Sequence, residues 1–315
     1  MKLTFFLLNL RTTLYCVMRP FYLVGVGLWL VVVVTYWTFG LVFLALDLRH
    51  RPTSLYARKI QAERSFDRKK LARLVAQLLF GQIVVLLPFA LLLGWLAERG
   101  IGIVVTPQFP RIIDVAWQLG VFVAWEEVAF YYSHRLLHHR LFYERFHKMH
   151  HEFTAPIALC ASYAHPVELA TGNILPLILG PVLCRAHVAT TALWFAVAVI
   201  GSQMHHCGYR FESAVLHLPG FDQQPDFHDF HHEVFRGNYG LIGVLDWFHG
   251  TDGRWRTALA ARDDALLKRP LRKRQPEAAA EAEGGGGGRR RRSAARRRRG
   301  FGLLAVASSN ASFRI

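Results

Sequence analysis

Residues 22–46 read YLVGVGLWLVVVVTYWTFGLVFLAL and contain 25 consecutive residues without a charge. About 20 apolar residues suffice to cross the hydrocarbon core of a bilayer as a helix. The run lies too deep in the chain and is too long for a cleavable secretory signal, and the preceding residues 2–19 offer no small-residue cleavage pattern. The sequence therefore predicts an integral membrane protein and argues against import into the secretory lumen.

Further apolar segments follow and predict an all-α, multi-span membrane bundle. They cover residues 75–96, 112–132, 169–184 and 189–204. Acidic residues within the third expected span, Asp114 and the pair Glu126 and Glu127, are costly in lipid, so they indicate a protein-facing site. The last two segments are short enough to form either a spanning hairpin or a re-entrant one. For them, buried helices of a soluble protein are the competing interpretation.

The distribution of positive charge predicts the orientation of the bundle. The loop 49–73 carries nine Lys and Arg residues, whereas the loop 97–111 carries two. Because cytoplasmic loops are enriched in positive charge, the first loop should be cytoplasmic and the second lumenal. The histidine-rich segments described below would then share the cytoplasmic face with the C-terminal tail.

Bulk composition combines 52% hydrophobic residues and a mean hydropathy of +0.21 with a net charge of +16. Most of that charge lies after residue 267, where 14 basic residues stand against three acidic ones among glycine and arginine runs. A soluble nucleic-acid-binding protein would not need the long apolar runs, and four cysteines without framework spacing rule out a disulfide scaffold. We expect a membrane region at 1–109, a domain at 110–255 that the resemblance described below implies is catalytic, and a basic, disordered tail at 256–315. The tail is either a polybasic segment for an anionic membrane or RNA, or a solvated extension.

Histidine is concentrated in two windows, 134–165 and 205–232, which hold thirteen of the sixteen histidines. Three motifs stand out: HRLLH from His134, HKMHH from His147 and HDFHH from His228. Residues at i, i+3 and i+4 share one face of a helix, so each motif points its imidazoles in one direction. One such motif alone would more often be structural, but three at the ends of membrane spans indicate a bound cation.

The number of histidines predicts two metal ions. Eight imidazoles exceed the four ligands of a single structural zinc, and no paired CxxC accompanies them. Nitrogen-rich sites suit iron, copper, nickel or zinc, and a pair of irons with open positions would activate dioxygen. No HExxH, GxSxG or phosphate-binding loop is present.

These motifs, in this order among apolar helices, resemble the fatty acid hydroxylase/sterol desaturase superfamily of membrane di-iron oxygenases. Surrounding stretches agree, among them FYYSHRLLHH from Phe130, FHKMHHE from Phe146 and NYG from Asn238. The nearest branch is similar to C-4 methylsterol monooxygenases and fatty acid hydroxylase domain-containing proteins. The resemblance covers about residues 110–255.

The resemblance implies a set of iron ligands and supporting residues. The implied ligands are His134, His138, His147, His150, His151, His228, His231 and His232. His206 and His165 are the candidates for completing the shells, and at least one of them is expected to do so. Asp229, Glu126, Glu127 and Glu168 are expected to fix the imidazole tautomers, although capping or an internal ion pair is the competing role. Surface or supporting roles are expected for His50, His139, His187, His217 and His249.

The resemblance also implies the chemistry. Two irons would use O2 and electrons from NAD(P)H, passed through a reductase and cytochrome b5, to hydroxylate, oxidatively demethylate or desaturate a sterol or fatty-acyl lipid. Residence in the endoplasmic reticulum follows from the family and from no signal in the chain. Two other readings stay open, a histidine-rich metal transporter and a catalytically inactive lipid-binding or scaffold protein.

Overall fold

The computed structural model describes residues 19–64, 68–211, 217–218, 221–222 and 225–267. These residues are almost entirely helical, as expected, and their only strands are the two-residue β1 (His217–Leu218) and β2 (Phe221–Asp222), which pair antiparallel. The longer helical elements are η1 (Phe21–Gly27), α2 (Leu28–Arg49), α4 (Leu71–Phe80), η3 (Gly81–Leu86), α5 (Leu87–Glu98), α6 (Ile112–Leu137), η7 (Leu169–Ile174), α8 (Leu175–Leu183), α9 (Val188–His205), α10 (Pro225–Val234) and α12 (Gly253–Leu267).

Four continuous helices among the described residues are long and apolar enough to cross a membrane. They are Phe21–Arg49, Leu71–Glu98, Pro166–Leu183 and Val188–His205. Each coincides with one of the apolar runs expected from the sequence to within one residue or contains it, and the prediction of a multi-span helical membrane bundle is confirmed.

The third expected span, residues 112–132, differs from the others. It is part of the 26-residue helix α6, but α6 is not among the candidate spans found in the described residues. Three carboxylates interrupt its apolar sequence, which is the physical reason for the difference. Its outer face is nevertheless apolar along its whole length, because the exposed side chains include Ile113, Trp117, Val121, Trp125, Val128, Tyr132 and Leu136.

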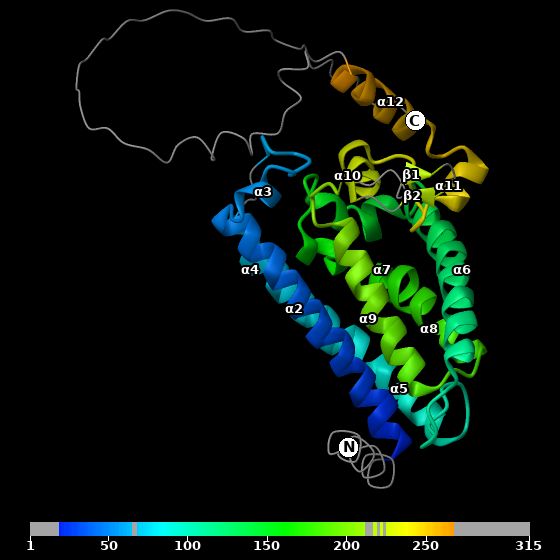
Figure 1. Ribbon diagram of the computed structural model, residues 1–315. Coiled ribbons are helices and arrows are strands. Elements are labelled where there is room, and N and C mark those ends of the chain that lie inside the picture. Colours follow the sequence, from blue (N-terminus) through cyan, green and yellow to red (C-terminus); the bar gives the residue numbers. More distant parts are fainter. Residues whose placement is uncertain (1–18, 65–67, 212–216, 219–220, 223–224, 268–315) are drawn as a thin grey trace, which may run out of the picture. The chain divides into compact units, whose positions relative to one another are not determined.

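Close packing of α2 against α9 forms the centre of the bundle, where the two helices lie side by side (Figure 1). Gly40 of α2 permits this approach, because a β-carbon at this position would collide with Leu159 and with Gln203 of α9. The Gln203 side chain is fully buried and donates a hydrogen bond from Nε2 to the carbonyl oxygen of Tyr36, 3.0 Å away. This buried polar contact fixes the register of the two helices.

Short helices and loops gather at the end of the bundle where α6 and α9 finish. They are α3 (Thr53–Tyr56), η2 (Arg68–Lys70), η4 (Tyr143–His147), η5 (His150–Glu152), η6 (Ala158–Ser162), α7 (Pro166–Glu168) and α11 (Val244–His249). The basic loop 49–73 belongs to this end, because Gln61 Nε2 donates to Asp229 Oδ1 of α10 at 2.7 Å and Arg73 pairs with Glu152 at 3.2 Å.

The expected disordered tail, residues 256–315, begins inside a helix. Helix α12 extends to Leu267, so residues 256–267 of the expected tail are helical. Trp255 of α12 is buried against the rings of Phe227 and Phe230, which explains why the helix forms there. Residues 268–315, including the arginine runs, lie outside the described residues.

Candidate metal centre

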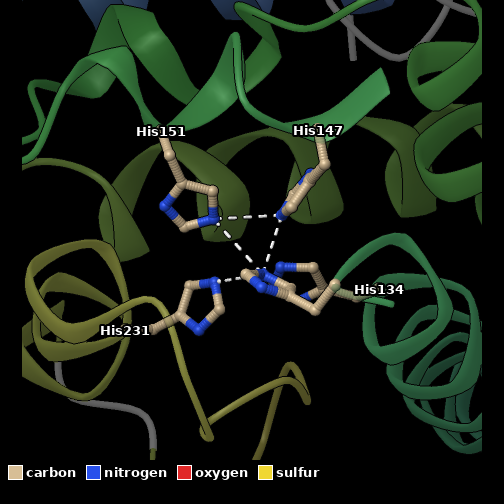
Figure 2. Close-up of side chains that lie close together, drawn as sticks. His134, His147, His151 and His231 are labelled. Atoms are coloured by element: carbon tan, nitrogen blue, oxygen red, sulfur yellow. Dashed lines mark hydrogen bonds between the residues drawn. The ribbon is translucent and has the colours of Figure 1, made fainter. Parts of the chain in front are cut away.

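Nine histidines converge in two groups at the end of the bundle. The first histidine group consists of His134, His138, His147, His151 and His231, and the second consists of His150, His206, His228 and His232. Within each group, one nitrogen of every ring lies within 4.8 Å of the corresponding nitrogens of the others. Figure 2 labels His134, His147, His151 and His231 of the first group, whose rings are directed toward a common centre.

The two groups are interlocked through the sequence motifs. In the motif from His147, the i and i+4 residues His147 and His151 belong to the first group, whereas His150 belongs to the second. The motif from His228 is the reverse, because His228 and His232 belong to the second group and His231 to the first. Each of these two motifs thus contributes to both groups, so each group depends on both motifs.

Backbone carbonyls fix the tautomers of five rings. The Nδ1 atoms of these rings lie 2.7–3.3 Å from a carbonyl oxygen, in the pairs His134 with Tyr239, His150 with Tyr163, His206 with Ser202, His231 with Gly237 and His232 with Phe153. A carbonyl can only accept a hydrogen bond, so Nδ1 carries the proton in each ring. The Nε2 atom of each ring therefore presents a bare lone pair to the centre of its group.

These lone pairs face one another at distances that suit a metal ion. His150 Nε2 and His206 Nε2 are 3.4 Å apart, and neither carries a proton to share. His134 Nε2 is buried and has no hydrogen-bond partner among the residues that the structure describes. Two nitrogens bound to one metal at about 2.0–2.1 Å are separated by roughly 2.9–3.4 Å. The donor set therefore fits two metal ions, one in each group.

Burial keeps the imidazoles in the form that binds metals. It lowers the pKa of His150 to about 4, and together with neighbouring imidazoles it lowers the pKa of His231 to about 3. For the same two reasons, burial first, the pKa values of His147, His151, His206, His228 and His232 lie well below 6.5. Neutral imidazole is the metal-binding form, so these rings are ready to coordinate at physiological pH.

The loop that supplies two of the tautomer-fixing carbonyls is itself anchored by carboxylates. Glu127 of α6 accepts hydrogen bonds from the backbone N–H groups of Leu241 and Ile242, both at 2.8 Å, and of Leu245 at 3.1 Å. Asp246 accepts from the N–H groups of Tyr239 at 2.8 Å and Gly240 at 2.5 Å. Residues 237–241, which we call the carbonyl loop, are thereby held against His134 and His231.

The four carboxylates expected to fix the tautomers do so only in part. Glu168 lies 2.9 Å from His147 Nδ1 and contacts a ring directly, whereas Glu127 acts through the carbonyl loop. Asp229 binds the side chain of Gln61 and no imidazole. Glu126 makes no hydrogen bond within the described part of the chain. Backbone carbonyls, which carry no side-chain signal in the sequence, take most of this role.

Of the two accessory candidates, the structure brings only His206 into a group. His165 lies outside both groups and caps α7, where its Nδ1 accepts a hydrogen bond from the N–H of Val167. The histidines expected to be peripheral are also outside: His187 caps α9, His249 stacks on Tyr131, His50 stacks on Tyr56, and His139 is exposed. The side chain of His217 lies outside the described residues.

A cavity extends from the histidine groups into the bundle. Six histidines border it, namely His134, His147, His150, His205, His206 and His228. Apolar residues of the helices form most of the remaining wall, including Val32, Leu86, Ile174, Leu177 and Ala198. An apolar chamber that ends at a metal-binding centre is suited to a lipid entering from the bilayer.

Comparisons with known proteins agree with this arrangement. The sequence model of the fatty acid hydroxylase family matches residues 119–251. Fatty acid hydroxylase domain-containing protein 2 of Homo sapiens is 37% identical over 238 residues, which is 74% of this chain and 68% of the relative. Methylsterol monooxygenase 2-2 of Arabidopsis thaliana is 30% identical over 233 residues, which is 73% of this chain and 85% of the relative.

A third relative, fatty acid hydroxylase ahd1 of Mycosarcoma maydis, is 34% identical over 205 residues, covering 65% of this chain and 51% of the relative. No solved structure matches the chain. The match to the family model, the extended similarity to its members and the histidine-rich helical architecture lead to one conclusion: this chain belongs to the fatty acid hydroxylase family.

Proposed function

We propose that the protein is a membrane-bound, di-iron, O2-dependent oxygenase that oxidises a C–H bond of a sterol or fatty-acyl lipid. The observation that carries this proposal is the pair of interlocked histidine groups, whose unprotonated nitrogens converge beside an apolar cavity. The family supports a lipid-modifying oxygenase, since its members include fatty acid hydroxylases and methylsterol monooxygenases.

The chain's own residues would position the metal ions and the lipid. The first histidine group would hold one iron and the second the other, with His206 completing the second and His165 taking no part. When bound, the irons would supply the activation of dioxygen and the oxidation of the C–H bond, using electrons from NAD(P)H delivered through a reductase and cytochrome b5. The apolar wall of the cavity would admit the lipid from the bilayer and exclude water from the reacting end.

A metal transporter is the main alternative, and the arrangement of the histidines disfavours it. A transporter would place ligands along a path through its spans. Here the four candidate spans contain one histidine, His205, at the very end of the last span. A catalytically inactive lipid-binding member is a second alternative, and the completeness of both histidine groups argues against it.

The orientation proposed for the site is cytoplasmic, in the endoplasmic reticulum. The basic loop 49–73 contacts the segments that carry the histidines, so the two lie on the same side of the membrane. Labelling with a membrane-impermeant maleimide in sealed endoplasmic reticulum vesicles tests this. Ser54→Cys should be labelled from the cytoplasmic side and Gln108→Cys only after permeabilisation, whereas the reverse pattern would overturn the orientation.

The experiment that tests the function combines metal analysis with turnover. We expect the purified protein to contain iron and to oxidise a sterol or acyl lipid in an NADH- and O2-dependent manner when a reductase and cytochrome b5 are supplied. His150→Ala and His231→Ala should abolish turnover, whereas His139→Ala, the exposed neighbour of His138, should retain it. Zinc without iron, or full turnover in the first two variants, would contradict the proposal.

A further inference from the structure

Glu126 on α6 is a partly buried residue whose carboxylate has one buried oxygen without a hydrogen bond in the described part of the chain. Its Oε2 atom is inaccessible to solvent and has no partner, and its side chain forms part of the cavity wall. A buried polar group without a partner is costly, and a carboxylate is the costliest kind. An unpartnered carboxylate in the wall of an apolar cavity is therefore available to bind a molecule that enters the cavity.

The geometry of α6 directs Glu126 into the cavity and away from lipid. Phe130 and Leu137 follow it by four and eleven residues, so all three share one helical face, and all three line the cavity. The exposed apolar side chains Trp125 and Val128 lie on a different face of the same helix. Glu126 therefore meets the contents of the cavity and no acyl chains outside the bundle.

The adjacent carboxylate has a different function. Both oxygens of Glu127 are used by backbone N–H groups of the carbonyl loop and α11. Two polar side chains in the cavity wall are also used: Tyr36 donates from its hydroxyl group to the carbonyl oxygen of Leu159 at 2.7 Å, and Gln82 Oε1 accepts from Trp37 at 2.9 Å. Glu126 differs from Glu127, Tyr36 and Gln82 because its buried Oε2 atom has no hydrogen-bond partner among the described residues.

The position of Glu126 separates it from the metal centre. It precedes His134 by eight residues on the same helix, which corresponds to about 12 Å along the helix axis. This is too far for Glu126 to coordinate an ion held by the first histidine group. It is a suitable distance for contacting a lipid whose other end lies beside the histidines.

We propose that Glu126 binds a hydroxyl group of the lipid substrate and so determines which carbon lies beside the histidine groups. The inference rests on the proposed oxygenase function and deepens it, because it specifies a hydroxyl-bearing lipid as the substrate class. A carboxylate accepts a hydrogen bond from an alcohol, and a protonated carboxyl group can also donate one, so both forms recognise the hydroxyl. A site with a buried polar group rejects an analogue that lacks the matching group, because the polar group then stays unpaired.

A hydroxyl group of this kind occurs in sterols and in long-chain alcohols, so the test includes both. Binding of radiolabelled cholesterol and cholest-5-ene, and of hexadecanol and hexadecane, is measured on the purified full-length protein in detergent. The lipids of each pair differ only in the hydroxyl group. This readout does not depend on the loading of iron.

Two substitutions of Glu126 provide the comparison. In the unaltered protein we expect one of the two alcohols to bind at least about tenfold more tightly than its hydrocarbon partner, as a hydrogen bond to a charged group would allow. Glu126→Gln keeps a hydrogen-bonding group of the same shape and should retain the preference. Glu126→Leu should bring the ratio close to one while hydrocarbon binding persists, which also shows that the variant is folded.

An equal affinity for alcohol and hydrocarbon in the unaltered protein would overturn the inference, as would an unchanged preference in Glu126→Leu. Failure of the inference and failure of the proposed function are distinguishable. Lipid oxidation without any hydroxyl preference would contradict only the role of Glu126. A hydroxyl preference in binding without oxidation of any lipid would contradict the oxygenase function and leave the binding role intact.

Discussion

The Nδ1 atom of His134 lies 2.8 Å from the carbonyl oxygen of Tyr239, although the two residues are separated by 105 positions along the chain. This hydrogen bond determines which nitrogen of His134 faces the centre of the first histidine group. Tyr239 is in turn held by the Asp246 carboxylate, and its neighbour Leu241 by Glu127. The readiness of the site to bind metal thus depends on residues that never touch it.

Glu127 is predicted to be a positioning residue. Glu127→Ala removes the acceptor for three backbone N–H groups of the carbonyl loop and α11, so His134 and His231 should lose their fixed orientation. We expect metal affinity at the first histidine group to fall by about 10- to 100-fold. Isothermal titration with Fe(II) under anaerobic conditions measures the change.

The controls for Glu127 separate positioning from general damage. Glu127→Gln, which keeps one acceptor oxygen, should recover part of the affinity. Glu144→Ala, which loses only an exposed pair with Lys148, should bind metal normally. If Glu127→Ala binds both ions as tightly as the unaltered protein, the carbonyl loop does not control the site.

The two accessory histidines should behave differently. His206→Ala removes a member of the second histidine group, so we expect the metal content to fall from two ions per chain to one. His165→Ala should keep both ions and lose only the helix cap, which is worth about 0.5–2 kcal/mol of stability. Inductively coupled plasma mass spectrometry of the purified variants would decide the matter, and metal loss in His165→Ala alone would reverse the assignment.

Acidification should destabilise the metal-free protein. Unfolded histidines take up protons below about pH 6.5, whereas His150 and His231 stay neutral in the folded state until about pH 4 and 3. The unfolded state therefore binds more protons in this window, and the free energy of unfolding falls as the pH is lowered from about 6.5 to 4. Each histidine lowers the free energy of unfolding by at most about 1.4 kcal/mol for each pH unit of acidification.

Asp229 opposes this trend, which provides a control. Burial raises its pKa to about 7, so the folded state holds a proton that the unfolded state has lost between about pH 4 and 7. Asp229→Asn removes the opposing contribution and should make the decline steeper. Thermal unfolding of the metal-free proteins in detergent measures both slopes, and a midpoint that rises on acidification would contradict the burial of neutral imidazoles.

Gly40 should tolerate no larger side chain. A β-carbon there would collide with Leu159 and Gln203, so Gly40→Ala should separate α2 from α9 and destabilise the fold by about 1–3 kcal/mol. A β-carbon on Gly120 of α6 would meet open space, so Gly120→Ala should be neutral or should stabilise the fold by about 0.5–1 kcal/mol. Thermal denaturation compares the two, and equal effects would show that the α2–α9 contact is not tight.

Much of the fold could be predicted from the sequence because the membrane demands long apolar runs. The run at residues 22–46 can hardly be anything other than a span, and its helix extends from Phe21 to Arg49. Helix α6 was harder to interpret, because Glu126 and Glu127 face the interior of the protein while its exposed outer face is apolar. Composition averages the two faces and hides both, whereas the structure separates Glu126 and Glu127 from Trp125 and Val128.

The histidines themselves could be predicted from their spacing, but their division into two groups could not. Helical periodicity places His147, His150 and His151 on one face. It does not reveal that His150 belongs to the second histidine group while His147 and His151 belong to the first. That division depends on how α10 approaches η4 and η5 in three dimensions. The carbonyl groups of Gly237 and Tyr239 were likewise invisible, because every residue has a carbonyl and only the fold selects these two.

The metal content of the intact protein tests the central claim most directly. Iron and zinc are quantified per chain in protein purified under anaerobic conditions, alongside His231→Ala from the first histidine group and His228→Ala from the second. The account predicts two irons per chain in the unaltered protein and close to one in each variant. A single ion per chain that disappears in both variants, or zinc in place of iron, would contradict it.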